Sequence, residues 1–80
     1  MPRDGTDALN EYLQRKGRLH SLSWQVRTTG PTHSPTWTCT CKINGEVKSV
    51  GTGTHQTAAK NMAANIALEA LIEGEETENN

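Results

Sequence analysis

The chain has 80 residues, which suits a single domain and leaves no room for a large enclosed active site. No run approaches the about 18 apolar residues of a membrane-spanning helix, and the N-terminal residues contain no apolar signal core. Cys39 and Cys41 are one residue apart, too close for a useful disulfide, which favours reduced thiols. We therefore expect an intracellular protein of the cytoplasm or nucleus, without a membrane partner.

Charge is unevenly distributed along the chain, whose formal net charge is −1. Over residues 1–72, eight lysines and arginines stand against five acidic residues, so this part carries +3. Four further glutamates follow within residues 73–78. The sequence thus predicts an acidic end and a mildly basic folded part, which permits phosphate binding without by itself predicting it.

A polar leader, residues 1–6, precedes a first helix predicted over Asp7–Lys16. Thr6 or Asp7 can cap its start, and Gly17 is suited to its C-terminal end. The apolar residues of this segment recur at helical spacing and share one face; they are Ala8, Leu9, Tyr12 and Leu13. One side of the helix is therefore expected to pack on the rest of the domain.

Three strands are predicted next, over Ser23–Thr28, Thr36–Ile43 and Glu46–Thr52. Turn and loop residues fill Thr28–Pro35, between the first two strands. Asn44–Gly45, between the second and third strands, is the strongest two-residue hairpin signal in the chain. The three strands are therefore expected to form an antiparallel meander.

Alternation along the strands predicts which side chains face the core. The inward-facing residues are expected to be Trp24, Val26, Trp37, Cys39, Cys41, Ile43, Val47 and Val50. The uneven spacing of Val47 and Val50 indicates a β-bulge near Lys48–Ser49, or an irregular strand end. Trp24 and Trp37 fit this inward face as core residues, although exposed tryptophans could stack on bases.

The last helix is predicted to begin at a cap on Thr54 or His55 and to be ended by Gly74. The folded domain then spans residues 7–73, and residues 74–80 are expected to form an acidic, disordered tail. The element order α-β-β-β-α predicts an α+β fold, in which two helices pack on one face of a three-stranded antiparallel sheet.

The start of the last helix follows the glycine-flanked turn Gly51–Thr54. Free backbone N–H groups and the positive end of the helix dipole can bind an anion there. Gln56, Thr57 and Lys60 share one side of this first turn, because residues three and four apart superpose on a helix. Their side chains suit phosphate oxygens; the alternative is an ordinary capped helix with exposed polar residues.

Four segments, in their order and spacing, carry a resemblance: ALNEYLQRKG (Ala8–Gly17), GPTH (Gly30–His33), WTCTCKING (Trp37–Gly45) and GTGTHQTAAKNMAANIALEAL (Gly51–Leu71). Together they make the span Ala8–Leu71 resemble the double-stranded-RNA-binding domain family. The resemblance implies the same α-β-β-β-α fold. It also implies binding along one face of an RNA duplex, across two minor grooves and the intervening major-groove phosphates, by shape more than by sequence.

The resemblance implies three contact surfaces. The first helix would face one minor groove, the loop Gly30–His33 would reach the next, and the start of the last helix would bind phosphates. Glu11 and Lys60 match the family's glutamate and lysine at their positions. The implied RNA-binding residues are Asp7, Asn10, Glu11, Gly30, Pro31, Thr32, His33, His55, Gln56, Thr57 and Lys60.

The third surface departs from the family. Its usual pattern is Lys-Lys-x-Ala-Lys, and this chain has Gln56-Thr57-Ala58-Ala59-Lys60. Two lysines are replaced by neutral hydrogen-bonding residues. If each lost charged contact is worth about 1 kcal/mol, the affinity for RNA falls about 30-fold. We therefore expect weaker RNA binding than is usual for the family.

Potential zinc ligands are present, but no Cys-x-x-Cys knuckle pairs them; they are Cys39, Cys41, His33 and His55. Cys39 and Cys41 are better interpreted as small apolar core residues on one strand face. No motif orders a nucleophile, a base or a cofactor either. We therefore expect no metal, no cofactor, no small-molecule substrate and no catalysis, although the domain could come from a larger RNA-processing enzyme.

Met62, Ile66 and Ala70 form an apolar stripe on the last helix. A wide buried arc, packed on the sheet and the first helix, accounts for this stripe. The alternative is an exposed patch that binds a protein partner or a second copy of the chain. The leading hypothesis is thus non-catalytic binding of double-stranded RNA; the other is a protein-interaction or dimerisation module with reduced RNA binding.

Overall fold

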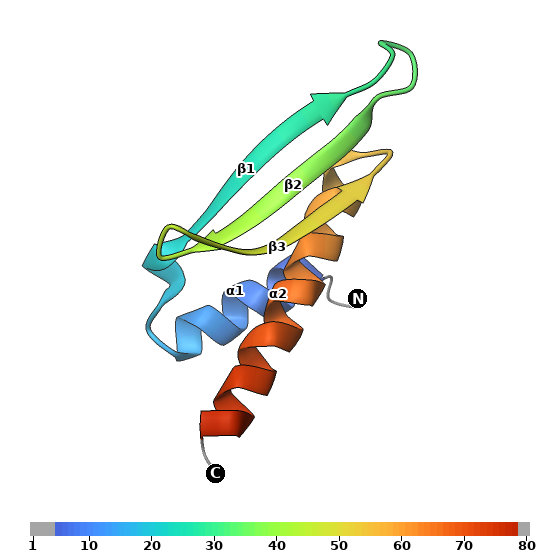
Figure 1. Cartoon of the computed structure of the whole chain (residues 1–80). Coiled ribbons are helices and arrows are strands. Elements are labelled where there is room, and N and C mark those ends of the chain that lie inside the picture. Colours follow the sequence, from blue (N-terminus) through green and yellow to red (C-terminus); the bar gives the residue numbers. More distant parts are fainter. Residues whose placement is uncertain (1–4, 79–80) are drawn as a thin grey trace.

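The computed structural model describes residues 5–78, and the side chains of residues 5–74. Its elements are α1 (Gly5–Arg15), a short 3-10 helix η1 (Leu19–Ser21), β1 (Leu22–Thr29), β2 (Thr36–Ile43), β3 (Glu46–Gly53) and α2 (Gln56–Glu78). The strands form one antiparallel sheet in the order β1-β2-β3, and both helices lie on the same face of it (Figure 1). The predicted α+β fold, α-β-β-β-α, is confirmed.

Residues with positive φ lie at the predicted end of the first helix and in the predicted hairpin turn. At Gly17 φ is +69°, and the N–H groups of Gly17 and Arg18 donate to the carbonyls of Gln14 and Leu13 at 3.1 and 2.8 Å. This double hydrogen bond is the Schellman arrangement that ends a helix, as the sequence predicts for α1. At the β2–β3 turn, Asn44 and Gly45 have φ of 57° and 80°, as a type I′ hairpin requires.

The predicted β-bulge lies in β3. Cys41 pairs with Ser49, whereas the next residue, Lys42, pairs with Val47, so Lys48 is the extra residue. A bulge resets the alternation of the strand, which changes the side chains that face the helices.

The prediction that Val47 and Val50 face the core was wrong. They point away from the helices and are 54% and 48% exposed, whereas Ser49 and Gly51 face α2 and are buried. The Ser49 hydroxyl donates a buried hydrogen bond of 2.6 Å to the carbonyl of Ala63. The bulge and the close approach of α2 to β3 together place these two small residues inside.

The buried core lies between the sheet and the two helices. Its buried members are Leu9, Leu13, Cys41, Ile43, Ala63, Ala64 and Ala67, with Tyr12, Leu22, Trp24, Leu68 and Leu71 partly buried against them. The alanines of α2 let its backbone lie close to the strands. Cys39 and Cys41 are fully buried free thiols, as their interpretation as core residues requires, and burial raises the pKa of both.

Both helices extend beyond their predicted outer ends. Helix α1 begins at Gly5, whose N–H donates to the side-chain oxygen of Asn61, and residues 1–4 of the expected leader lie outside the described residues. The prediction that Gly74 ends the last helix was wrong: α2 continues to Glu78, because a glycine inside a helix costs only about 1 kcal/mol. Of the expected tail, residues 79–80 lie outside the described residues, and the proposed domain boundaries stay a prediction.

In the described part of the chain, no helix is long and apolar enough to cross a membrane.

Candidate nucleic-acid interface

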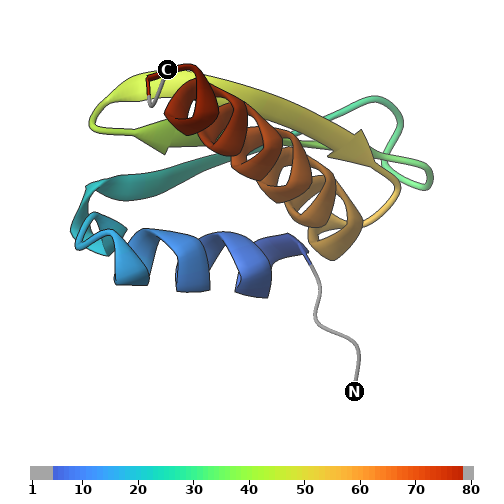
Figure 2. The same ribbon diagram turned by 90° about the horizontal axis from the view of Figure 1, so that it is seen from below.

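The fold brings the three expected contact segments to one end of the molecule. Figure 2 shows the start of α1, the start of α2 and the β1–β2 loop toward the right-hand end. In Figure 1 the start of α2 lies between the other two. The turn between β2 and β3 and the end of α1 lie at the opposite end of the sheet. Segments far apart in the sequence thus follow one another along a single side.

On α1, the three expected residues fall in the first half of the helix. Asp7 is exposed, and Asn10 and Glu11 are half-buried. Their spacing of three and four places them on one side of the helix, away from the buried Leu9 and Leu13. Two carboxylates and an amide are therefore presented together, next to the start of α2.

The β1–β2 loop presents exposed residues on a fixed turn. Gly30 has φ of +96°, a conformation that favours glycine, and the Ser34 N–H donates to the Pro31 carbonyl at 3.1 Å. Thr32 and His33 are exposed beside them. The loop is thus a turn with accessible backbone and one imidazole.

A hollow of about 400 Å³ lies at the base of this loop, lined by Thr28, Thr29, Gly30, Pro31, Thr32, Pro35 and Trp37. Trp37 is half-buried on the inward face of β2, and the core cluster of the described residues does not include it. Trp24, by contrast, packs against that cluster. The core interpretation is therefore confirmed for Trp24, whereas Trp37 lies under the loop.

The start of α2 is capped by His55, whose carbonyl accepts a hydrogen bond of 3.1 Å from the N–H of Ala59. His55, Gln56 and Thr57 are all exposed, and the first turn contains no acidic residue. Donors and the positive helix end are therefore accessible to an anion there.

Lys60 lies differently from the polar residues before it. It is half-buried, and its ammonium group lies 5.1 Å from the centroid of the Trp24 ring, on β1. The side chain thus runs toward β1 along the inward face of the sheet. The sequence offered no signal for this contact, because it joins residues 36 positions apart through the tertiary fold.

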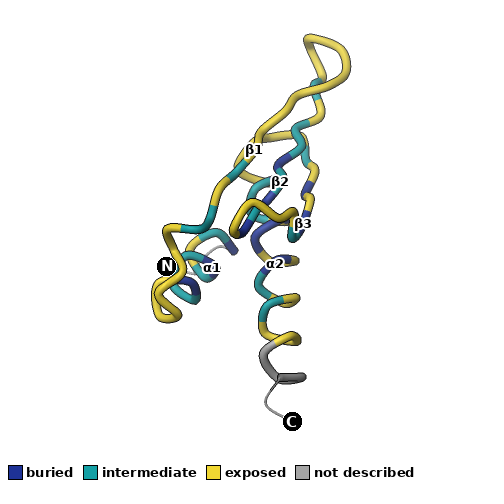
Figure 3. The backbone as a smooth tube through the Cα atoms, turned by 60° about the vertical axis from the view of Figure 1, so that its left-hand side comes forward, coloured by how far each residue is buried: buried dark blue, intermediate teal, exposed yellow. Residues whose placement is uncertain are grey.

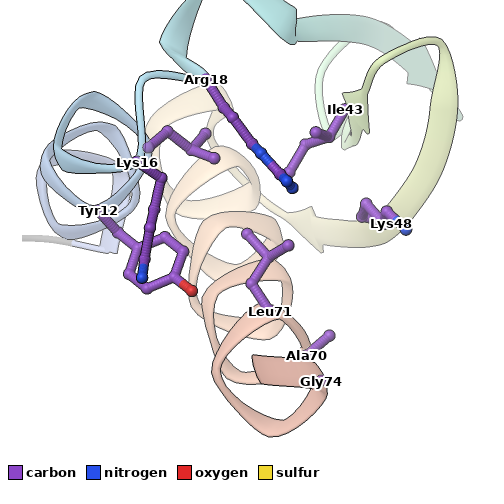
Figure 4. Close-up of a pocket in the computed structure, with 9 residues that line it drawn as sticks. Tyr12, Lys16, Arg18, Ile43, Lys48, Ala70, Leu71 and Gly74 are labelled. Atoms are coloured by element: carbon purple, nitrogen blue, oxygen red, sulfur yellow. The ribbon is translucent and has the colours of Figure 1, made fainter. Parts of the chain in front are cut away.

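Other cations gather at the opposite end. Lys16, Arg18 and Lys48 line a pocket of about 410 Å³ together with the apolar side chains of Ile43 and Leu71 (Figure 4) and of Leu13. Lys48 pairs with Glu46 at 3.3 Å, and the Lys16 ammonium lies 5.7 Å from the Tyr12 ring. Lys16 and Lys48 therefore do not join the three segments at the other end of the sheet.

The apolar stripe of α2 is exposed. Met62 and Ile66 are 47% and 42% exposed, and Ala70 is exposed as well. Figure 3 shows α2 exposed along its outer side. The prediction of a wide buried arc was therefore wrong, because the small side chains of Ala59, Ala63 and Ala67, on the inner side, make the contact with the sheet.

Metal binding finds no support in the described part of the chain, where no group of three or more histidines, cysteines and acidic residues is placed to hold an ion. Cys39 and Cys41 are enclosed in the core. The Cys39 thiol makes one weak hydrogen bond, of 3.7 Å, to the carbonyl of Gln56.

Two helices on one face of a three-stranded meander, with three loop and helix ends gathered along one side, form a small α+β domain (Figure 1 and Figure 2). The family model described as the double-stranded RNA binding motif matches residues 7–71. The chain belongs to this family.

Similar proteins include two bacterial enzymes and a viral protein. The chain is 37% identical over 68 residues to ribonuclease 3 of Ligilactobacillus salivarius, which covers 85% of this chain and 29% of that protein. It is 34% identical over 73 residues to ribonuclease 3 of Coxiella burnetii, covering 90% of this chain and 31% of the enzyme. It is also 34% identical over 64 residues to RNA-binding protein OPG065 of Monkeypox virus, covering 80% of this chain and 40% of that protein. The chain thus spans well under half the length of these relatives.

Proposed function

We propose that the chain is a non-catalytic domain that binds double-stranded RNA through its shape and backbone, largely independently of sequence. The match of residues 7–71 to the double-stranded RNA binding motif carries the proposal. The gathering of the three segments along one side supports it, because a rigid duplex can touch all of them only if they share a side. We further propose that the domain serves as the RNA-binding part of a larger RNA-processing protein, since it corresponds to a minor part of two ribonucleases.

Each segment is assigned to one part of the duplex. In this proposal, Asn10 and Glu11 on α1 accept hydrogen bonds from 2′-hydroxyls in one minor groove, with Asp7 beside them. The exposed backbone of Gly30–Pro31, with Thr32 and His33, reaches the next minor groove. An A-form duplex presents its 2′-hydroxyls in a wide, shallow minor groove, which suits this mode.

The start of α2 is assigned to the phosphates between the two grooves. His55, Gln56 and Thr57 are exposed there and can donate hydrogen bonds, but Gln56 and Thr57 bring no charge. Lys60 supplies the cation. Fewer charged contacts release fewer counterions, so we propose binding that is weaker and less sensitive to salt than in relatives with three lysines.

One titration tests this function. A 16-base-pair RNA duplex of arbitrary sequence should bind the protein at low salt, and a second sequence should bind equally well. The DNA duplex of the same sequence should bind at least about tenfold more weakly, because it lacks 2′-hydroxyls and A-form grooves. Fluorescence anisotropy at several salt concentrations gives both the affinity and the salt dependence.

Lys60→Ala is the informative variant in this titration. It should weaken binding about fivefold and make the slope of log K against log salt shallower by about one, because one phosphate contact is lost. Lys48→Ala is the matched control, since it removes a charge from the opposite end of the sheet. The absence of RNA binding at low salt, or equal binding of the DNA duplex, would contradict the function.

Exposure of Met62 and Ile66 favours a second candidate function, an interface for a protein partner or for a second copy of the chain. If the stripe mediates self-association, Met62→Glu should raise the dissociation constant of the dimer at least tenfold, because it places a charge in an apolar contact. Sedimentation equilibrium of the wild type and the variant measures this constant. Gln14→Glu, which adds the same negative charge at an exposed position of α1, controls for the change in charge.

A wild-type protein that stays monomeric at high concentration would rule out the dimer. RNA binding should be the same in Met62→Glu and the wild type, because Met62 is not among the residues assigned to the duplex.

A further inference from the structure

The helices leave part of the inward face of the sheet open. Val26 pairs with Cys39 across β1 and β2, so both side chains point toward the helices. Cys39 is fully buried, yet Val26 is 40% exposed. Helix α2 packs over β2 and β3 (Figure 1), and the exposure of Val26 shows that the inward face of β1 is accessible there. This open strip is the surface of β1 around Val26, between Trp24 and the β1–β2 loop.

The Lys60 side chain borders this strip. Trp24 pairs with Cys41, so its ring also lies on the inward face, two residues before Val26. The Lys60 ammonium lies 5.1 Å from the centroid of that ring. The positive charge of Lys60 also reaches Cys39 on β2. It favours the thiolate and so opposes the rise that burial causes in the pKa of the Cys39 thiol. The aliphatic part of the lysine thus follows apolar surface while the charged end lies over the indole.

We propose that Trp24 is a positioning residue for Lys60, holding its ammonium at the border of the open strip so that it can bind one of the duplex phosphates assigned to the start of α2. The inference rests on the proposed function, because it takes Lys60 to be a phosphate contact. The ring occupies one side of the ammonium, which leaves N–H donors on its other sides for phosphate oxygens. A lysine free in solvent loses rotamer freedom when it binds a phosphate, whereas a lysine held by an indole has already lost part of it.

This arrangement bears on the two missing lysines. Gln56 and Thr57 are neutral, so Lys60 is the only cation within the segment 56–60. Holding this one charge in place before RNA binds raises the affinity for RNA without adding a second charge. Trp24 therefore partly offsets what the substitution of the two lysines removes.

The test combines a direct probe of the contact with a double-mutant cycle. In the free protein, the Cε protons of Lys60 should show an upfield ring-current shift in NMR spectra, which Trp24→Leu abolishes and Trp24→Phe keeps in part. Trp24→Leu should weaken binding of a 16-base-pair RNA duplex about two- to fivefold, the range expected for loss of a cation–π contact. In the Lys60→Gln background, the same change should have no further effect on the affinity. A residue that served the core alone would weaken binding equally in both backgrounds.

Trp24→Phe keeps an aromatic ring in the core, so it tests the contact even if Trp24→Leu does not fold. Lys16→Gln is the matched control: it removes a lysine that also lies over an aromatic ring, Tyr12, but at the opposite end, and its effect should add to that of Trp24→Leu. Equal losses in the Lys60 and Lys60→Gln backgrounds, or no ring-current shift, would overturn the positioning role and leave RNA binding intact. Absence of RNA binding by the wild type would overturn the proposed function and the positioning role together.

Discussion

Gly51→Ala is expected to lower the free energy of unfolding by about 2–3 kcal/mol, because β3 and α2 meet at this residue without space for a methyl group. A Cβ at Gly51 would contact the Ala59 carbonyl oxygen and would lie 2.5 Å from the backbone N of Ala63. These are backbone atoms of α2, so they can move only if the helix shifts away from the sheet. Urea unfolding followed by circular dichroism measures the loss.

Gly74→Ala is the matched control, because Gly74 lies in α2 and, among the described residues, a Cβ there would meet no atom of another segment within 4 Å. It should leave the stability unchanged or raise it by up to about 1 kcal/mol through the higher helix propensity of alanine. If both alanine variants changed the stability equally, the close approach at Gly51 would not be the cause. A Gly51→Ala protein as stable as the wild type would show that α2 can move at little cost.

Leu9→Ala is expected to have the other large effect, a loss of about 3 kcal/mol. Leu9 lies on α1 and is fully buried in the core cluster that α1 shares with α2. The change therefore removes apolar contacts and leaves a cavity that the two helices cannot fully close. For a domain of 80 residues this is a large share of the total stability. Thermal and urea unfolding should both report it.

Leu19→Ala serves as the control for the leucine change. Leu19 is 39% exposed in η1, so its truncation should cost less than about 1 kcal/mol. Since Leu9 holds α1 to the core, RNA binding by Leu9→Ala should be measured well below its melting temperature. A loss of stability no larger than that of Leu19→Ala would contradict the placement of Leu9 in the core.

Local signals in the sequence predicted most of the fold. Strict alternation in β2, the Asn44–Gly45 turn and the glycine after α1 each have one common structural solution. The uneven valines of β3 pointed to the bulge. They did not show which way the valines would face, because that depends on how closely α2 approaches Gly51, a distance between elements.

The candidate site was predictable only in part. The sequence and its resemblance to the family predicted three RNA-contact segments, and the fold places these segments along one side of the molecule. The orientation of Lys60 toward Trp24 and the exposure of Met62 could not be predicted, because both depend on which side of α2 meets the sheet. The four buried alanines of α2 decide this, because only small side chains allow the helix to lie so close. The contacts of the individual site residues with RNA stay predictions.

The bulge in β3 also works against self-assembly at one edge of the sheet. The sheet is open at both sides, and the unpaired backbone of an edge strand can add a strand from another molecule. At the β3 edge the bulge interrupts the regular spacing of donors and acceptors, and it falls on Lys48, which is charged and paired with Glu46. A strand of a neighbouring molecule that tried to continue the ladder would meet an irregular backbone and two charges. The one-residue insertion therefore works against edge-to-edge aggregation as well as setting the side chains beneath α2.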